Sequence, residues 1–150
     1  MKLWGEDGIF SKGDEGEILK LGPHQVEIVF RREETGGSLG ALIFTHSVIT
    51  DDTPHAHDHW TKIAHVLTGK YSFRVGDAKF EAGPGDSILI PRGSHHAFTT
   101  QTGGKILFVG SPAGNEDFFL EISRLGERAT TAQVREIWNR FGTRGLPKPR

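Results

Sequence analysis

Hydrophobic and polar positions alternate in short runs over residues 26–110, and a turn signal follows most of the runs. Val26-Glu27-Ile28-Val29-Phe30 is the first such run, and Lys105-Ile106-Leu107-Phe108-Val109 is the last. Alternation with a period of two buries one face of an extended strand, and Gly, Pro and Asp between runs favour turns. The pattern predicts short strands at residues 26–30, 39–49, 62–67, 71–75, 78–82, 87–90, 95–99 and 105–109.

The spacing of these strands indicates an all-β sandwich or barrel. Gly76-Asp77 suits a two-residue hairpin loop, and Gly83-Pro84-Gly85-Asp86 suits another turn. No helical pattern interrupts residues 26–110, which argues against a parallel α/β sheet. Residues 1–25 have few periodic apolar positions, so we expect an irregular lead-in with one short strand at most.

The hydrophobic period changes to that of a helix after residue 116. One apolar face is formed by residues 118–125 and a second by residues 134–141. Thr130 or Thr131 can cap the second helix, and Gly142 can end it. We expect these helices to pack on the barrel, and residues 146–150 to form a loose end.

Five of the eight histidines fall in two short pieces of the chain, at residues 55, 57, 59, 95 and 96. On one strand, residues i, i+2 and i+4 share a face, so His55, His57 and His59 could point into one cavity. His96 from a distant segment would then complete a metal site with open positions. The alternative is that these histidines form a solvated polar face of a strand.

The composition of the chain limits which partners and which metal ligands the protein can have. The chain has 150 residues, which suits one domain, and its formal net charge is -1, which suggests no nucleic-acid or anionic-membrane partner. It has no cysteine, so any metal must be held by nitrogen and oxygen ligands. No apolar run approaches the roughly 20 residues that span a bilayer, and the acidic start has no signal-peptide pattern. We therefore expect a soluble, cytoplasmic protein.

The histidine segments resemble the two motifs of the cupin superfamily. The first motif runs His-x-His, three or four residues, Glu, six residues, Gly, and the chain has His55, His57, Lys62 and Gly69 in that frame. Only the glutamate is replaced. The part of the chain after the predicted barrel, around residues 111–119, is also similar to small cupins related to quercetin dioxygenases.

The second motif runs Gly, five residues, Pro-x-Gly, two residues, His. Gly85, Pro91, Gly93 and His96 match it without a gap, although the Asn that often follows is Thr100 here. The resemblance implies a single cupin domain over residues 1–150, with an antiparallel jelly-roll barrel at about 26–110 and a helical tail at about 116–142. It also implies one metal ion held by His55, His57 and His96.

Lys62 stands where the family has its glutamate ligand. A protonated lysine has no free lone pair and repels a dication, by about 4 kcal/mol per unit charge pair at 4 Å and an effective dielectric constant of about 20. Three outcomes remain open. Lys62 could lose its proton and act as a ligand or base, it could stay charged beside the site and face an anionic substrate, or the site could have lost its metal.

The expected positions of the other histidines follow from the alternation of side chains along each strand. His59 could be a fourth ligand or a general base, or it could lie at the rim on a bend. His65 is out of phase with Lys62, and His95 with His96, so both should face away from the site. His24 and His46 belong to no motif, and we expect them to be structural.

Three neutral imidazoles suit Fe2+, Ni2+, Cu2+, Zn2+ or Mn2+, and we expect Fe2+. The resemblance implies a dioxygenase acting on a small oxygenated or aromatic substrate. We expect Lys62 and His59 to be its catalytic residues, beside the metal, where they would orient the substrate or exchange protons. Phe44, Phe73 and Phe98 could line the cavity. The alternatives are a non-redox isomerase or lyase, and a binding protein that has lost the glutamate ligand. Edge strands favour a homodimer.

Overall fold

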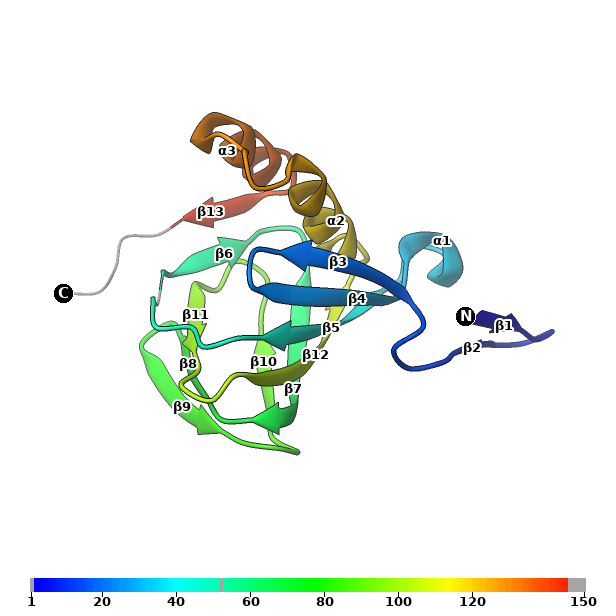
Figure 1. Cartoon of the computed structure of the whole chain (residues 1–150), viewed down its shortest axis with the longest axis horizontal. Coiled ribbons are helices and arrows are strands. Elements are labelled where there is room, and N and C mark those ends of the chain that lie inside the picture. The colour runs from blue at the N-terminus through cyan, green and yellow to red at the C-terminus, as the bar shows by residue number, and fades with distance from the viewer. Residues whose placement is uncertain (1, 52, 146–150) are drawn as a thin grey trace.

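The computed structural model describes residues 2–51 and 53–145, and their main body is two antiparallel sheets packed face to face (Figure 1). The first sheet has six strands in the order β10-β7-β12-β5-β4-β3, and the second has five in the order β13-β6-β11-β8-β9. The strands of the first sheet are β3 (Glu17–Leu21), β4 (His24–Phe30), β5 (Gly40–His46), β7 (Thr61–Gly69), β10 (Ser87–Ile90) and β12 (Gly104–Ser111). Those of the second are β6 (His55–His57), β8 (Tyr71–Val75), β9 (Ala78–Ala82), β11 (His96–Thr99) and β13 (Thr143–Gly145).

Alternation along each strand decides which side chains enter the core. On β7, Lys62, Ala64 and Val66 are buried, whereas Ile63 and Leu67 are exposed on the outer face. The core between the sheets is formed mainly by aliphatic and aromatic side chains such as Val26, Ile28, Leu42, Val66, Tyr71, Phe73, Ile106 and Phe108. Burying each large side chain contributes roughly 1.5–3 kcal/mol, so the sandwich holds its shape around any site at its end.

The helical tail covers one end of the sandwich (Figure 1). Helix α2 (Asn115–Leu125) and helix α3 (Thr131–Arg140) pack around Trp60, Phe118 and Ile137. Thr130 caps α3, because its side chain accepts a hydrogen bond from the Gln133 backbone N–H while the Gln133 side chain bonds back. The predicted helices and their cap are therefore confirmed.

Strand β13 follows the tail and was not predicted. It pairs antiparallel with β6, with Thr143 opposite His57 and Gly145 opposite His55. Arg144 holds this strand to the bend after β6 through two hydrogen bonds to Asp58, at 2.8 and 2.9 Å. The C-terminal part of the chain is thus hydrogen-bonded into the second sheet rather than only packed on it.

The N-terminal prediction was wrong. Residues 1–25 were expected to hold one short strand at most, but they contain β1 (Lys2–Trp4), β2 (Ile9–Ser11), β3 and the start of β4. Strands β1 and β2 form a separate hairpin beside helix α1 (Arg32–Thr35), and Lys2 forms an ion pair with Glu34 of that helix. The expected turn at residues 33–37 is mostly this helix, followed by Gly36 in the left-handed conformation.

The all-β jelly-roll fold with C-terminal helices is confirmed. Its strands run from β3 to β12 and then resume at β13, so they extend beyond the expected limits of about 26 and 110. The expected loose end at residues 146–150 lies outside the described residues. No helix in the described part of the chain is long and apolar enough to cross a membrane.

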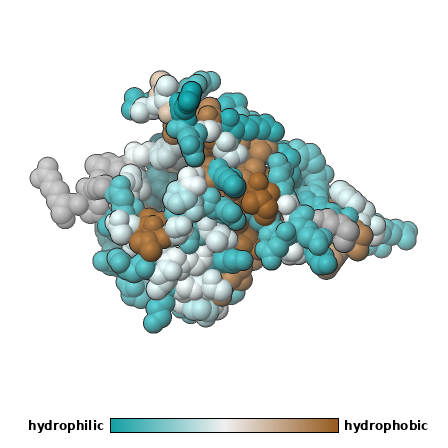
Figure 2. All heavy atoms as spheres, viewed as in Figure 1, coloured by the Kyte–Doolittle hydropathy of each residue, from teal (hydrophilic) through white to brown (hydrophobic). Residues whose placement is uncertain are grey.

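The surface in Figure 2 is mainly hydrophilic, with hydrophobic side chains gathered in a few patches, one of them below the helical tail. Exposed apolar side chains also lie on the outer face of the six-stranded sheet, among them Ile18, Ile63, Leu67 and Leu89. Homodimer formation stays a prediction, and this outer face is one surface on which it can be tested.

Candidate metal centre

Three histidines from two neighbouring strands converge at the end of the sandwich that the tail covers. His55 and His57 share a face of β6 because they are two residues apart, and His96 of β11 lies directly opposite His55. One ring nitrogen from each of the three lies within 4.8 Å of the others. His57 and His96 are buried, at 4% and 1% exposure, and His55 is half-buried.

The second nitrogen of each ring is already engaged. Nδ1 of His96 lies 3.1 Å from the Ser94 carbonyl oxygen, and Nδ1 of His57 lies 2.9 Å from the Thr143 hydroxyl. Nδ1 of His55 lies 3.4 Å from the Thr53 carbonyl oxygen. A carbonyl oxygen can only accept, so the Nδ1 atoms of His55 and His96 donate and their Nε2 atoms keep a lone pair. The histidines of protein metal sites are held in the same way.

Two of the three histidines have a buried ring nitrogen that no described residue bonds. Nε2 of His57 and Nε2 of His96 are buried and have no hydrogen-bond partner among residues 2–51 and 53–145. Leaving such an atom unsatisfied costs about 1–3 kcal/mol, so two of them side by side require an explanation. A divalent ion bound by three neutral imidazoles is the explanation that fits their chemistry.

The charge state of the rings suits a cation. Burial, and after it the nearby charge of Lys62, lowers the pKa of His55 to about 4 and that of His96 to about 2. The pKa of His57 is lowered still more strongly, by burial first and then by Lys62. All three rings are therefore neutral at pH 7, which is the form that coordinates metal.

Lys62 lies on the inner face of β7, close enough to act electrostatically on all three histidines. It is only 4% exposed, and its Nζ lies 4.7 Å from the centre of the Phe108 ring. No carboxylate in the described part of the chain forms an ion pair with it. Burial lowers the pKa of Lys62 to about 7, so neutral and charged forms coexist near neutral pH.

A cavity of about 380 Å³ opens beside His55 and Lys62. Its walls are mainly aromatic and aliphatic, and they come from both the sandwich and the tail: His24, Phe44, His46, Ile49, His55, Lys62, Phe98, Phe108, Phe118, Phe119, Ile122, Val134 and Trp138. This volume lies within the range of about 300–1,000 Å³ found for small-molecule sites. Of the three aromatic residues expected to line a cavity, Phe44 and Phe98 do so, whereas Phe73 is fully buried in the core.

Comparison with known proteins agrees with the observed fold. Residues 48–110 match the family model described as "Cupin domain", and this stretch contains all three histidines and Lys62. The chain has a cupin fold. A search of curated proteins found no match.

Several solved cupin-like structures share this fold. An RmlC-like cupin from Shewanella frigidimarina is 24% identical, with a TM-score of 0.63 over 72% of this chain and 94% of that one. KdgF from Halomonas sp. is 20% identical, with a TM-score of 0.65 over 73% and 98%. A Streptomyces Pac13 variant with uridine is 11% identical, with a TM-score of 0.60 over 92% and 90%. At these identities the likeness establishes the fold alone, and the finer resemblance to quercetin dioxygenases stays a prediction.

Three other histidines, His59, His65 and His95, lie outside the three-histidine cluster of the cupin barrel. His59 is exposed on the bend at residues 58–59, after β6 has ended, and it is not in the three-histidine cluster. A Cβ on Gly142 would lie 2.7 Å from its ring, so it contacts the end of the tail. Of its two possible positions, the rim on a bend is therefore the one observed. His65 is bonded to Ser87 on the outer face, and His95 is exposed, as their phase predicted.

Three residues near the cupin site were not assigned to it from the sequence. Thr143 bonds to His57, and His24 and His46 line the cavity, although both histidines were expected to be purely structural. A signal for His46 existed, because it is in phase with the buried Leu42 and Phe44 on β5. Thr143 gave no such signal, since a three-residue strand after a helix has too few positions to show alternation.

Proposed function

We propose that this protein is a metal-dependent enzyme that acts on a small, mainly apolar organic substrate bearing at least one oxygen. His55, His57 and His96 would hold one divalent ion, and the cavity beside them would hold the substrate. The observation that carries this proposal is the convergence of three histidine nitrogens beside a cavity that also contains Lys62, and two of these histidines have a buried Nε2 atom with no partner among the described residues. If these histidines had only a structural role, the buried Nε2 atoms of His57 and His96 would remain unexplained.

Of the possible ions, Fe2+ is the one we propose, although three imidazoles also suit Ni2+, Cu2+, Zn2+ and Mn2+. The bound ion would supply open coordination positions and either redox or Lewis-acid chemistry. Because the three imidazoles are neutral, they leave the ion's double positive charge uncompensated. The site would therefore favour an anionic substrate such as an enolate or a catecholate.

Lys62 would generate the substrate anion by removing a proton from the substrate. Near pH 7 a fraction of its side chain is neutral, and the neutral amine can accept the proton of a substrate hydroxyl. The substrate O–H bond breaks, an N–H bond forms, and the resulting ammonium then lies beside the substrate anion. The aromatic walls of the cavity exclude water, which strengthens this pairing.

The reaction class that we propose is a dioxygenase that cleaves its substrate with O2. A redox-active ion held by His55, His57 and His96 would supply the electron-transfer chemistry that O2 requires, and the cavity would hold the electron-rich substrate anion beside it. A second candidate is a non-redox isomerase, lyase or dehydratase in which Lys62 moves a proton and no O2 is consumed. It is favoured by the pKa of Lys62 near 7. Pac13, which shares the fold, is described as a nucleoside dehydratase.

The deciding experiment begins with the metal content of protein purified without an affinity tag. The protein is then reconstituted with Fe2+ under anaerobic conditions and mixed with catechol or 2,4-pentanedione as probes, and O2 uptake is followed. Uptake that requires both metal and probe supports the dioxygenase. Exchange of probe carbon-bound protons with D2O, without O2 uptake, supports the second candidate. If the protein neither retains nor takes up a stoichiometric divalent ion, the proposal is wrong and the fold serves as a metal-free binding module.

A further inference from the structure

His46 forms part of the cavity wall but is not one of the three histidines of the metal centre, so the metal centre does not explain why it is there. His46 ends β5, is 4% exposed, and lines the cavity. Its ring stacks on Phe44 with centroids 4.3 Å apart and nearly parallel planes, and it meets Phe98 edge-on at 5.1 Å. These contacts fix the orientation of the ring, so its two nitrogens have defined directions.

Tyr71 determines where the proton of His46 lies. The Tyr71 hydroxyl is 2.8 Å from Nδ1 of His46, and both side chains are buried. Burial raises the pKa of the Tyr71 phenol well above its ordinary value, so the phenol keeps its proton, and His46 is the acceptor that the described residues offer it. Burial also lowers the pKa of His46 to about 3, so the ring is neutral. A neutral ring that accepts at Nδ1 carries its own proton on Nε2.

No residue that the structure describes accepts a hydrogen bond from this N–H group. Nε2 of His46 is buried and unbonded among residues 2–51 and 53–145. The two nitrogens of an imidazole diverge, so Nε2 is directed away from Tyr71, which lies in the core. An N–H group that is withdrawn from water and unpaired beside a cavity is a site for an acceptor atom.

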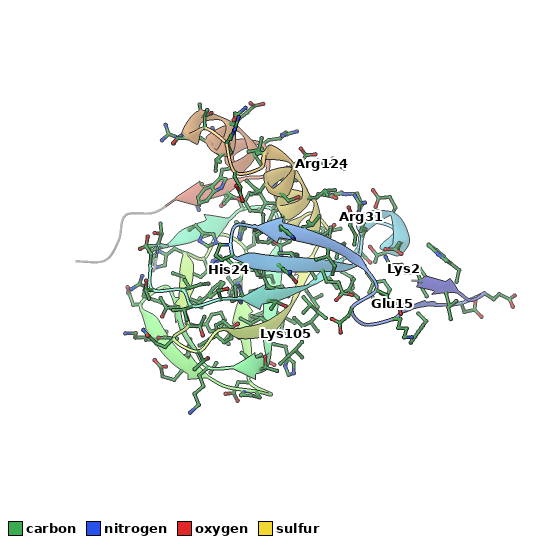
Figure 3. The ribbon with its side chains drawn as sticks, in the orientation of Figure 1. Lys2, Glu15, His24, Arg31, Lys105 and Arg124 are labelled. Carbon is green, nitrogen blue, oxygen red and sulfur yellow. The ribbon has the colours of Figure 1, made fainter. Side chains whose placement is uncertain are left out.

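His24 repeats the pattern next to His46. It lies at the start of β4 (Figure 3), and its ring centroid is 5.6 Å from that of His46. The Ser47 backbone N–H donates to Nδ1 of His24 at 3.1 Å, so a neutral His24 also carries its proton on Nε2. Lys62 adds further N–H donors to the same cavity. No lining residue that the structure describes carries a carboxylate, so these donors are not balanced by acidic acceptors.

We propose that His46, held by Tyr71, is a specificity-determining residue whose Nε2–H binds an acceptor oxygen, such as a carbonyl or phenolic oxygen, on an aromatic ligand. The aromatic body would contact the phenylalanines that line the cavity, and His24 would donate beside His46. This rests on the proposed function only in taking the cavity as the substrate site. It concerns binding, so it does not depend on which metal is bound or on which reaction follows.

Two shape-matched probes test the proposal. Acetophenone has a carbonyl oxygen where α-methylstyrene has a CH2 group, and NMR titration gives the dissociation constant of each for the protein as purified. We expect the parent to bind acetophenone about tenfold more tightly, the effect of one buried hydrogen bond. His46→Leu should abolish the preference, whereas His46→Gln, which keeps an N–H donor near the Nε2 position, should restore most of it.

The controls separate recognition from folding and from metal binding. His65→Gln changes a histidine on the outer face and should leave both dissociation constants unchanged, and circular dichroism checks that each variant is folded. A 15N spectrum of the imidazoles should show the Nε2–H form of His46 in the parent and its partial loss in Tyr71→Phe. The proposal is overturned if the parent binds neither probe at millimolar concentration, or shows no preference, or if a folded His46→Leu keeps it. Metal content is measured separately, so failure here is distinguishable from failure of the metal site.

Discussion

Thr143 lies directly opposite His57 across the β6–β13 pair, and its hydroxyl is 2.9 Å from Nδ1 of that histidine. A residue near the C-terminus thereby orients a ring whose partner ligand, His96, comes from the middle of the chain. Thr143 and His57 are 86 residues apart in the sequence, yet they meet in one site. The helical tail therefore belongs to the candidate metal centre and is not simply a cover for the barrel.

The first prediction follows from this contact. Thr143→Val removes the hydroxyl and leaves the His57 ring free to turn, so metal affinity should fall by roughly 10–100-fold, as for other residues that support a ligand. Isothermal titration with Zn2+ measures the change. Thr143→Ser keeps the hydroxyl and should retain affinity close to that of the parent. Equal affinities in the Val and Ser variants would mean that the hydroxyl does not orient His57.

The second prediction concerns the ligand set. Replacing His55, His57 or His96 by Ala should each lower metal occupancy by about tenfold or more, because one of three nitrogen ligands is lost. His95→Ala is the matched control, since His95 is the neighbour of His96 but is exposed. Metal analysis after dialysis gives the occupancies. Full occupancy in His96→Ala would remove that residue from the ligand set, whatever happened to activity.

Much of this site could be predicted from the sequence, because strand periodicity and motif spacing are local. Alternation on β7 places Lys62 inside and Ile63 outside, as observed. His55 and His57 share a face for the same reason, and the match to the cupin motifs supplied His96. Such inferences need only the chain direction and the period of two.

What could not be predicted depends on where strands end and what they pair with. His59 continues the spacing of two, but β6 ends at His57 and the chain bends so that Trp60 enters the core. The pairing of β13 with β6 is a tertiary contact that three residues cannot encode locally. His46 was in phase with core residues, yet only the assembled cavity shows that its second nitrogen has no partner in the described part of the chain.

The third prediction concerns the tail as a wall of the cavity. Trp138 is half-buried, lines the cavity and lies 5.9 Å from the His55 ring between centroids. Because it is only partly buried, Trp138→Ala should lower the free energy of unfolding by about 1–3 kcal/mol, less than the 3–5 kcal/mol of a fully buried tryptophan. It should also weaken binding of an aromatic probe such as acetophenone.

A neighbouring residue provides the control for this change. Asn139→Ala alters an exposed position of the same helix and should affect neither stability nor probe binding appreciably. Urea unfolding and NMR titration measure the two quantities on the same samples. Lost stability with unchanged probe binding would limit Trp138 to packing and would detach α3 from the cavity.

The last prediction uses the pH dependence of stability to test the state of Lys62. Burial lowers the pKa of this side chain from an ordinary value of 10.5 to about 7 in the folded protein. Between these two pH values the unfolded chain binds more protons than the folded one, so the free energy of unfolding must rise with pH. Below pH 7 both states are protonated, and the folded protein bears the full cost of a buried ammonium, on the order of 5 kcal/mol.

Lys62→Met keeps the length of the side chain and removes the charge. In metal-free protein it should therefore stabilise the fold, most at pH 6 and least at pH 10, as measured by urea unfolding at each pH. Lys105→Met on β12, outside the core, reports what the same substitution does elsewhere. A gain that is constant from pH 6 to pH 10 would mean that Lys62 keeps its proton throughout, and it could not then act as the base that we propose.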